Sequence, residues 1–255
     1  MIKISKYVLL DIVHNRFVLL YTGFLLLVTL SMMGLEGNAE KITLSLLNII
    51  LMVVPLVSIV FTTIHFFNSY EFIELMLSQP ISRKAIFISE FLSVSLALCL
   101  AFVAGVGVPL MVFGGSAAAT SLLLTGCLLT LVFVSLAFSA SVFTRDKAKG
   151  IGVAMLFWIY FTLIYDGFML AVIYSFNDYP LEKITLALVS LNPVDLARVM
   201  ILLKLDISAL MGYTGAFYKQ FFGSHLGTLY SLGLLCLWAF VPAWMAVRKF
   251  VRKDI

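Results

Sequence analysis

The amino-acid sequence predicts an all-α membrane protein with six transmembrane helices. The chain of 255 residues is 62% hydrophobic and only 12% charged, whereas soluble domains are about a quarter charged. Its hydrophobic residues fall into six long runs, and a helix needs about 20 apolar residues to cross the hydrocarbon core of a bilayer. The runs are continuous rather than alternating, and in lipid such a run satisfies its backbone groups only as a helix.

The predicted elements form a single domain, residues 1–255, because we find no interval that builds a soluble core of its own. Residues 1–16 are expected to form a basic amphipathic leader helix. The apolar run after it is too long for a cleavable signal peptide. The long segment 176–225 is expected to lie outside and to contain short helices. The six spans are predicted at about 17–35, 42–67, 88–113, 119–142, 151–175 and 226–247.

The basic residues predict the orientation of these spans. Six spans place both termini on one side of the membrane, together with the second and fourth connections. That side carries twelve of the 17 Lys and Arg residues, and such an excess marks the cytoplasmic side. The net charge of +4 is therefore assigned to membrane orientation, and no nucleic-acid partner is expected. The five bases on the other side are Lys41, Lys183, Arg198, Lys204 and Lys219.

A short charged stretch, NSYEFIELMLSQPISRK, interrupts the apolar sequence between the second and third spans. Asn68 is expected to cap a short helix, with Glu71 completing a capping box. Phe72, Leu75 and Met76 are expected to share the apolar face of this helix. Pro80 would stop the helix, and Ser82 would cap the next one. A helix this short needs a surface to lie on, which is either the lipid headgroups or a cytoplasmic protein.

The same stretch, continued as YEFIELMLSQPISRKAIFISEF, resembles the loop between the second and third spans of ABC-2 type permeases. The resemblance extends over the leader helix, the six spans, the last external segment and the basic tail. It implies that this short helix is the coupling helix, which docks into a groove of a separate cytoplasmic ATPase subunit that binds ATP and Mg. The residues that it implicates in coupling are Asn68, Glu71, Phe72, Glu74, Leu75, Ser78, Gln79, Pro80 and Arg83.

The resemblance also implies an assembly and a location. Half-transporters of this kind pair with a second permease copy, and a homodimer is expected in the lipid of the bacterial inner membrane. Two further phrases, FWIYFTLIYDGFMLAVI and LNPVDLARVMILLKLDISALMGYTGA, resemble the permeases that accompany nitrous-oxide reductase maturation. That likeness implies export, or force transmission to a periplasmic partner, in copper or sulfur delivery.

Asp166 lies inside the fifth span, where an ionisable group is costly and usually faces protein or water. It is interpreted either as a residue of the translocation route, or as a carboxylate that is bonded to a neighbouring helix or lies shallow enough to reach the interface. In the external segment, Asn192 and Pro193 separate two helical runs, and Pro193 suits the first turn of a helix. The family resemblance implies that these external helices form a gate, with Asn192, Pro193 and Asp195 as its candidate residues.

Other functions find less support in the sequence. There is no Walker A pattern, and the three histidines have no metal-ligand spacing, so neither catalysis nor a metal site is expected. His65 and Glu90, at the cytoplasmic ends of the second and third spans, are interpreted as interfacial polar groups, with a contact between the two as the less favoured alternative. The main alternative is an ATP-independent secondary transporter or channel that uses Asp166 as an ion or proton site.

Overall fold

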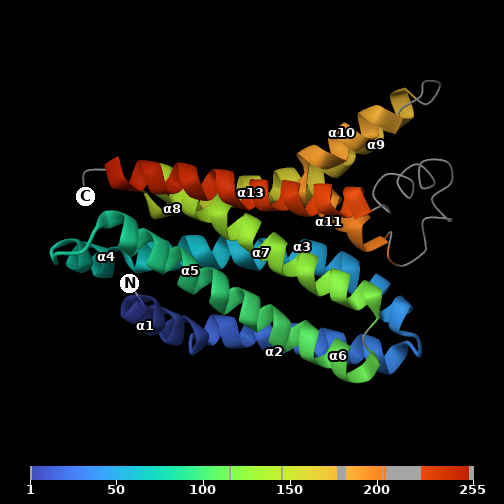
Figure 1. Ribbon diagram of the computed structural model, residues 1–255, viewed down its shortest axis with the longest axis horizontal. Coiled ribbons are helices and arrows are strands. Elements are labelled where there is room, and N and C mark those ends of the chain that lie inside the picture. The colour runs from blue at the N-terminus through green and yellow to red at the C-terminus, as the bar shows by residue number, and fades with distance from the viewer. Residues whose placement is uncertain are drawn as a thin grey trace.

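The structure is a computed structural model that describes residues 2–114, 116–144, 146–176, 182–202, 204 and 225–252 (Figure 1). Every regular element in these residues is a helix, and two of the helices, η1 and η2, are π-helical. In chain order they are α1 (Ile2–Val13), α2 (Arg16–Leu35), α3 (Ala39–Asn68), α4 (Tyr70–Leu77), α5 (Arg83–Phe102), η1 (Val103–Gly107), α6 (Val108–Gly114), α7 (Ala117–Phe143), α8 (Lys147–Ile159), η2 (Tyr160–Ile164), α9 (Tyr165–Ser175), α10 (Glu182–Leu191), α11 (Pro193–Leu202) and α13 (His225–Arg252).

The predicted all-α class and its six spans are confirmed. Among the described residues, the helices that are long and apolar enough to cross a membrane are Arg16–Leu35, Glu40–Asn68, Arg83–Val112, Ala117–Phe143, Lys147–Ser175 and Gly227–Arg252. Parts of the external segment, residues 177–181, 203 and 205–224, lie outside the described residues.

Two spans begin earlier than their apolar residues predict, because polar caps set their first turns. Ser82 Oγ accepts a hydrogen bond from the backbone N–H of Ala85 at 3.4 Å, so the third span starts at Arg83. Asp146 Oδ1 accepts from the N–H of Ala148 at 3.1 Å, so the fifth span starts at Lys147. The first N–H groups of a helix lack partners within it, and these caps supply one.

Helix α7 forms the centre of the bundle, and the helices around it are unequally covered. In α7, 67% of the most apolar window is buried, mainly against α3 and α13. In α13 the corresponding share is only 17%, and α2 and the α8–α9 span are also largely uncovered. These peripheral helices therefore present the surfaces available to lipid or to another subunit.

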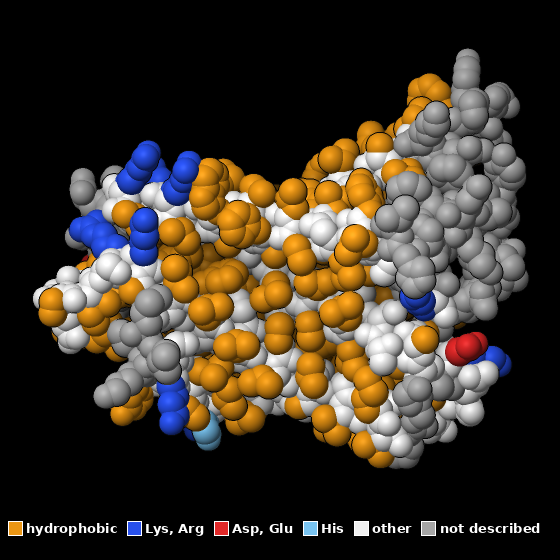
Figure 2. Space-filling view, viewed as in Figure 1, with side chains coloured by type: hydrophobic (Ala, Val, Ile, Leu, Met, Phe, Trp, Pro, Cys, Tyr) orange, Lys and Arg blue, Asp and Glu red, His pale blue; other side chains and the backbone are white. Residues whose placement is uncertain are grey.

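One end of the bundle carries α1, α4 and the last turn of α13 (Figure 1). On the face shown in Figure 2, a hydrophobic band covers the middle of the molecule, and most Lys and Arg side chains lie at this end. We call it the basic end. Helix α1 packs along α5 there, and the hydroxyls of Ser5 and Ser93 lie 3.2 Å apart.

Small residues in the third and fourth spans allow close helix approach, as two glycines show. A Cβ at Gly105 in η1 would lie 2.7 Å from Leu25 Cβ and 3.0 Å from the carbonyl oxygen of Thr22, both on α2. The ring of Phe102 lies directly against Gly126 of α7. The backbones of η1 and α2 therefore approach each other over a surface that has no room for a side chain.

Replacing Gly105 with Val is expected to destabilise the bundle by about 1–3 kcal/mol, the usual effect of overpacking a filled interior. The readout is the thermal unfolding midpoint of the detergent-solubilised chain. Gly233→Val is the matched control, because nothing lies within 4 Å of a Cβ at Gly233. An equal fall in both variants would contradict a specific contact between η1 and α2.

Candidate functional site

Helix α4 is a short, anchored helix at the basic end (Figure 1). Ile73 is only 1% exposed and belongs to the main hydrophobic core, and Met76 and Leu77 pack against that core. Residues three and four apart share a face of a helix. These three side chains therefore form the inward face, which holds α4 against the rest of the bundle.

The opposite face of α4 points away from the bundle. Glu71, Glu74, Leu75 and Ser78 are exposed and follow the spacing of one helical face, and the Leu75 side chain is 64% exposed. We call these four residues the outward face of α4. An exposed leucine beside two carboxylates is a surface suited to a protein partner, because acidic groups gain little at an anionic lipid surface.

The nine predicted coupling residues lie on and around this helix. Arg83 is half-buried at the start of α5. The other eight side chains are exposed: Asn68, Glu71, Phe72, Glu74, Leu75, Ser78, Gln79 and Pro80.

Two local predictions about α4 were wrong. Asn68 does not cap α4, because α3 continues to Asn68 and the capping residue is Ser69, whose side chain makes no cap hydrogen bond. The Asn68 carboxamide oxygen instead accepts from Lys147 Nζ at 2.7 Å. The predicted apolar face, with Phe72 and Leu75, is also incorrect, since the buried face is centred on Ile73.

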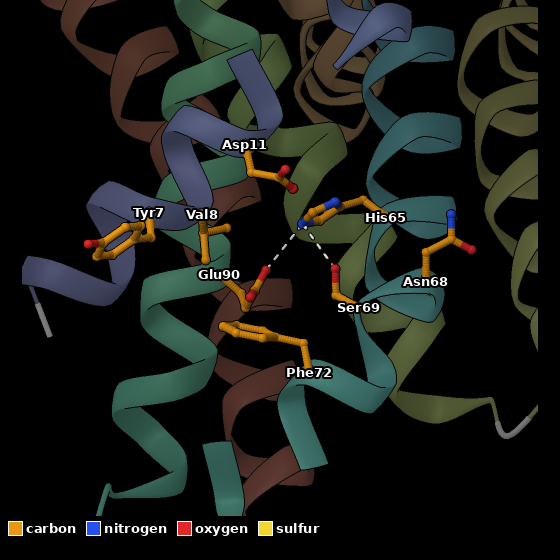
Figure 3. Close-up of a pocket in the computed structure, with 8 residues that line it drawn as sticks. All are labelled: Tyr7, Val8, Asp11, His65, Asn68, Ser69, Phe72 and Glu90. Carbon is orange, nitrogen blue, oxygen red and sulfur yellow. Dashed lines mark hydrogen bonds and ion pairs between the residues drawn. The ribbon is translucent and has the colours of Figure 1, made fainter. Parts of the chain in front are cut away.

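A cavity of about 400 Å³ lies behind α4 (Figure 3). Four elements, α1, α3, α4 and α5, supply its lining: Tyr7, Val8, Asp11, His65, Asn68, Ser69, Phe72 and Glu90. His65 Nε2 lies 3.2 Å from Glu90 Oε2 and 3.4 Å from Ser69 Oγ. Glu90 is only 3% exposed, so it is not the interfacial group expected from the sequence. The pair joins α3 to α5, the two spans that α4 connects.

A second constellation lies toward the other end of the bundle and consists of Asp166, Asn192, Asp195 and Arg198. We call it the outer polar cluster. The Arg198 guanidinium contacts Asp166 at 3.0 and 3.4 Å and Asp195 at 3.0 Å. Asn192 Nδ2 donates to Asp195 Oδ2 at 2.8 Å. The sequence nominated three of these residues, and the structure brings them together through Arg198, which the sequence analysis counted only among the external bases.

The π-helix η2 is the part of the fifth span to which this cluster is attached. A π-turn interrupts the regular hydrogen bonding of an α-helix and is frequent at functional sites. The carbonyl oxygen of Phe161, within η2, accepts from Asn192 Nδ2 at 2.9 Å. The hydroxyl of Tyr165, just after η2, donates to the carbonyl of Leu188 in α10 at 2.7 Å. Both α10 and the start of α11 are therefore bonded to the fifth span.

The helices α10 and α11 form a sharply bent pair, with an angle of 115° between them. The predicted break at Asn192 and Pro193 is confirmed, and Pro193 is the first residue of α11. The side-chain oxygen of Asn192 accepts from the N–H of Val194 at 2.9 Å and so caps the helix. Each helix has ten residues, about 15 Å, which is too short to span alone.

Helix α11 is inserted into the bundle. Every residue from Pro193 to Leu202 is buried except Arg198, which is half-buried. The helix packs against α7, α13 and α3. Burial raises the pKa of Asp195, and the nearby Asp166 carboxylate adds to the rise while Arg198 opposes it. The Arg198 side chain is shared between the Asp166 and Asp195 side chains.

The described residues contain no group of three or more His, Cys, Asp or Glu side chains arranged to hold a metal ion. The polar groups of the outer cluster are instead directed at one another and at backbone atoms. These interactions hold the helices of the cluster together.

Comparison with known proteins identifies the family. Residues 5–255 match the sequence profile of ABC-2 family transporter proteins. The chain belongs to the ABC-2 transporter family. The resemblance inferred from the loop before α5 is thereby confirmed over nearly the whole chain, and the protein is a multi-pass membrane permease.

Two curated relatives of this ABC-2 protein carry the same name, probable ABC transporter permease protein NosY. The one from Pseudomonas aeruginosa is 31% identical over 153 residues, 54% of this chain and 54% of the relative. The one from Stutzerimonas stutzeri is 28% identical over 196 residues, 68% of this chain and 63% of the relative. The matched region thus spans between half and two thirds of each relative.

Proposed function

We propose that this chain is the permease subunit of an ATP-binding-cassette transporter and that α4 couples it to a separate cytoplasmic ATPase. The observation that carries the proposal is the two-sided construction of α4. Its inward face is fixed to the core by Ile73, while its outward face presents Leu75 beside two carboxylates. Because α4 is firmly anchored, a force applied to its exposed surface is transmitted to the rest of the bundle.

The transmission path runs from α4 into the two spans on either side of it. Helix α4 is continuous in sequence with α3 and α5, and the contact between His65 and Glu90 joins those two spans behind it. A movement of α4 toward the membrane therefore displaces both spans together. Because a ligand shifts an equilibrium only by its differential affinity for two states, the ATPase must hold α4 through its whole cycle.

At the other end, the outer polar cluster is proposed to hold the gate. It fixes the start of α11 to the fifth span through Asp166, Arg198 and Asn192. Tilting of the spans would separate these groups and release α11 from the bundle. In this scheme the basic end faces the cytoplasm, in agreement with the excess of Lys and Arg there.

The assembly is proposed to contain two permease copies in the bacterial inner membrane, with ATP and Mg bound by the ATPase subunits. The Asp166 and Arg198 side chains are each 32% exposed, and such groups within a membrane normally face protein or water. A second copy, or a water-filled route between two copies, meets that requirement. The sequence resemblance to permeases that accompany nitrous-oxide reductase maturation favours a role in that process, by cargo export or by force on a periplasmic partner. The names of the two relatives agree with a permease of an ABC transporter.

The decisive experiment is co-purification of the detergent-solubilised chain with candidate cytoplasmic ATPase subunits, with and without nucleotide. A stable complex whose ATPase activity depends on the permease supports the proposal. If no ATPase binds under any nucleotide condition, the coupling function is refuted. An ATP-independent transporter that uses Asp166 then becomes the leading hypothesis.

A further inference from the structure

A second cavity at the basic end differs in chemistry from the one behind α4. Its volume is about 420 Å³, and it lies between the start of α5 and the end of α13. Its lining consists of three cations and three apolar side chains: Lys84, Arg248, Arg252, Trp244, Val247 and Val251. Among the residues that the structure describes, no carboxylate contributes to this lining.

Aromatic packing fixes the two helix ends that form this cavity. The rings of Phe87 and Phe250 lie 5.3 Å apart, and both side chains are almost fully buried. Lys84 lies one helical turn before Phe87, while Arg248 and Arg252 lie on either side of Phe250. The three cations are therefore brought together by the fold, although exposed like charges repel one another.

The charges of this cavity are not neutralised within the part of the chain that the structure describes. None of the ion pairs there involves Lys84, Arg248 or Arg252. The Arg248 guanidinium lies 3.6 Å from the centre of the Trp244 ring, which orients it by a cation–π contact. Its N–H groups remain available to an anion.

The apolar side of the cavity indicates what kind of anion fits. Val247, Val251 and Trp244 lie on α13, the least covered of the six spans, and Trp244 is 43% exposed. Exposed tryptophan is typical of the membrane–water interface. Figure 2 shows Lys and Arg side chains beside the hydrophobic band at this end. The cavity therefore offers cations to a headgroup and an apolar wall to an acyl chain.

We propose that this cavity binds the phosphate headgroup of an anionic phospholipid in the leaflet at the basic end. Basic pockets beside transmembrane helices are suited to such headgroups. The lipid supplies the missing negative charge and connects α5 to α13. Lys84 follows α4 closely in sequence, so the bound lipid also stabilises the start of the span that α4 moves.

The test is native mass spectrometry of the purified chain, titrated with phosphatidylglycerol or phosphatidylcholine in detergent. The wild-type chain is expected to retain phosphatidylglycerol preferentially. The Lys84→Gln/Arg248→Gln/Arg252→Gln variant is expected to bind it at least about tenfold more weakly. The control, Lys6→Gln/Arg16→Gln/Lys149→Gln, removes three exposed charges outside the cavity and is expected to bind as the wild type does.

Each alternative result overturns the proposal. Equal losses in the two triple variants would mean that only net charge matters, and an unchanged affinity would mean that the cavity is not the site. Displacement of the lipid by millimolar inorganic phosphate would assign the cavity to a free anion. A loss of ATPase binding with unchanged lipid binding would assign it to an acidic protein surface. The single Arg252→Gln variant, expected to show an intermediate loss, covers the case in which the triple variant does not fold.

Discussion

Changing Glu74 to Arg and Leu75 to Asp together is expected to abolish the complex between this permease and its ATPase. Both side chains lie on the outward face of α4, and neither contributes to the inward face that Ile73 anchors. The double change reverses a charge and places a carboxylate where an apolar contact is expected. Central interface positions contribute about 1–2 kcal/mol each, so the two changes together should lower the affinity about 30- to 1,000-fold.

The measurement is the amount of ATPase that co-purifies with each variant at equal permease concentration. The matched control is Glu40→Arg/Leu35→Asp, which makes the same two kinds of change at exposed positions far from the basic end. The control is expected to retain the complex. Retention of the complex by the α4 variant would mean that the ATPase docks elsewhere, and loss in both variants would point to general misfolding.

The six spans could be predicted from the sequence because a single physical requirement decides them. A run of about 20 apolar residues in lipid has one way to satisfy its backbone. The ends of the spans depend on capping side chains, which a hydropathy pattern does not take into account. Ser82 and Asp146 extend the third and fifth spans toward the basic end by capping turns that contain lysine.

The details of α4 could not be predicted with the same rule. Six of its eight residues, YEFIELML, are apolar or aromatic, so periodicity allows more than one buried face. The choice of Ile73 as the anchor depends on the shape of the surface formed by distant elements. Asn68 was assigned to the wrong helix, since α3 continues through it, and its side-chain partner Lys147 lies 79 residues away in the sequence.

The outer polar cluster was predicted only in part, for a related reason. Asp166 stands out within an apolar span, but Arg198 is 32 residues away and looks like one more external base. The π-helix η2 also inserts an extra residue just before Asp166, which rotates everything after it by about 100° relative to a regular helix. Asp195 and Arg198, three residues apart on α11, were the available sign that a charged pair lies there.

Replacing Arg198 with Gln is expected to loosen the attachment of α11 to the fifth span. The change leaves Asp166 and Asp195 close together without their shared cation, and removing one partner of a buried pair is strongly destabilising. Because Arg198 and Asp166 are each about a third exposed, solvent screening reduces the effect to about 1–2 kcal/mol. Amide hydrogen exchange in residues 193–202 should accelerate about tenfold. Lys204→Gln, which removes an exposed base nearby, is the control and should leave exchange unchanged.

The double variant Asp166→Asn/Arg198→Gln separates the two interpretations of Asp166. Suppose that the outer polar cluster holds α11 to the fifth span. Removing both charges then relieves the repulsion between Asp166 and Asp195, and amide hydrogens of the double variant exchange more slowly than those of Arg198→Gln alone. If Asp166 is instead an ion or proton site, Asp166→Asn is the damaging change and the second substitution rescues nothing. If the effects of the two single substitutions on exchange are additive, the cluster does not hold the helices together, because coupled neighbours in one network deviate from additivity by about 0.5–3 kcal/mol. The close contacts of Arg198 with both carboxylates favour suppression.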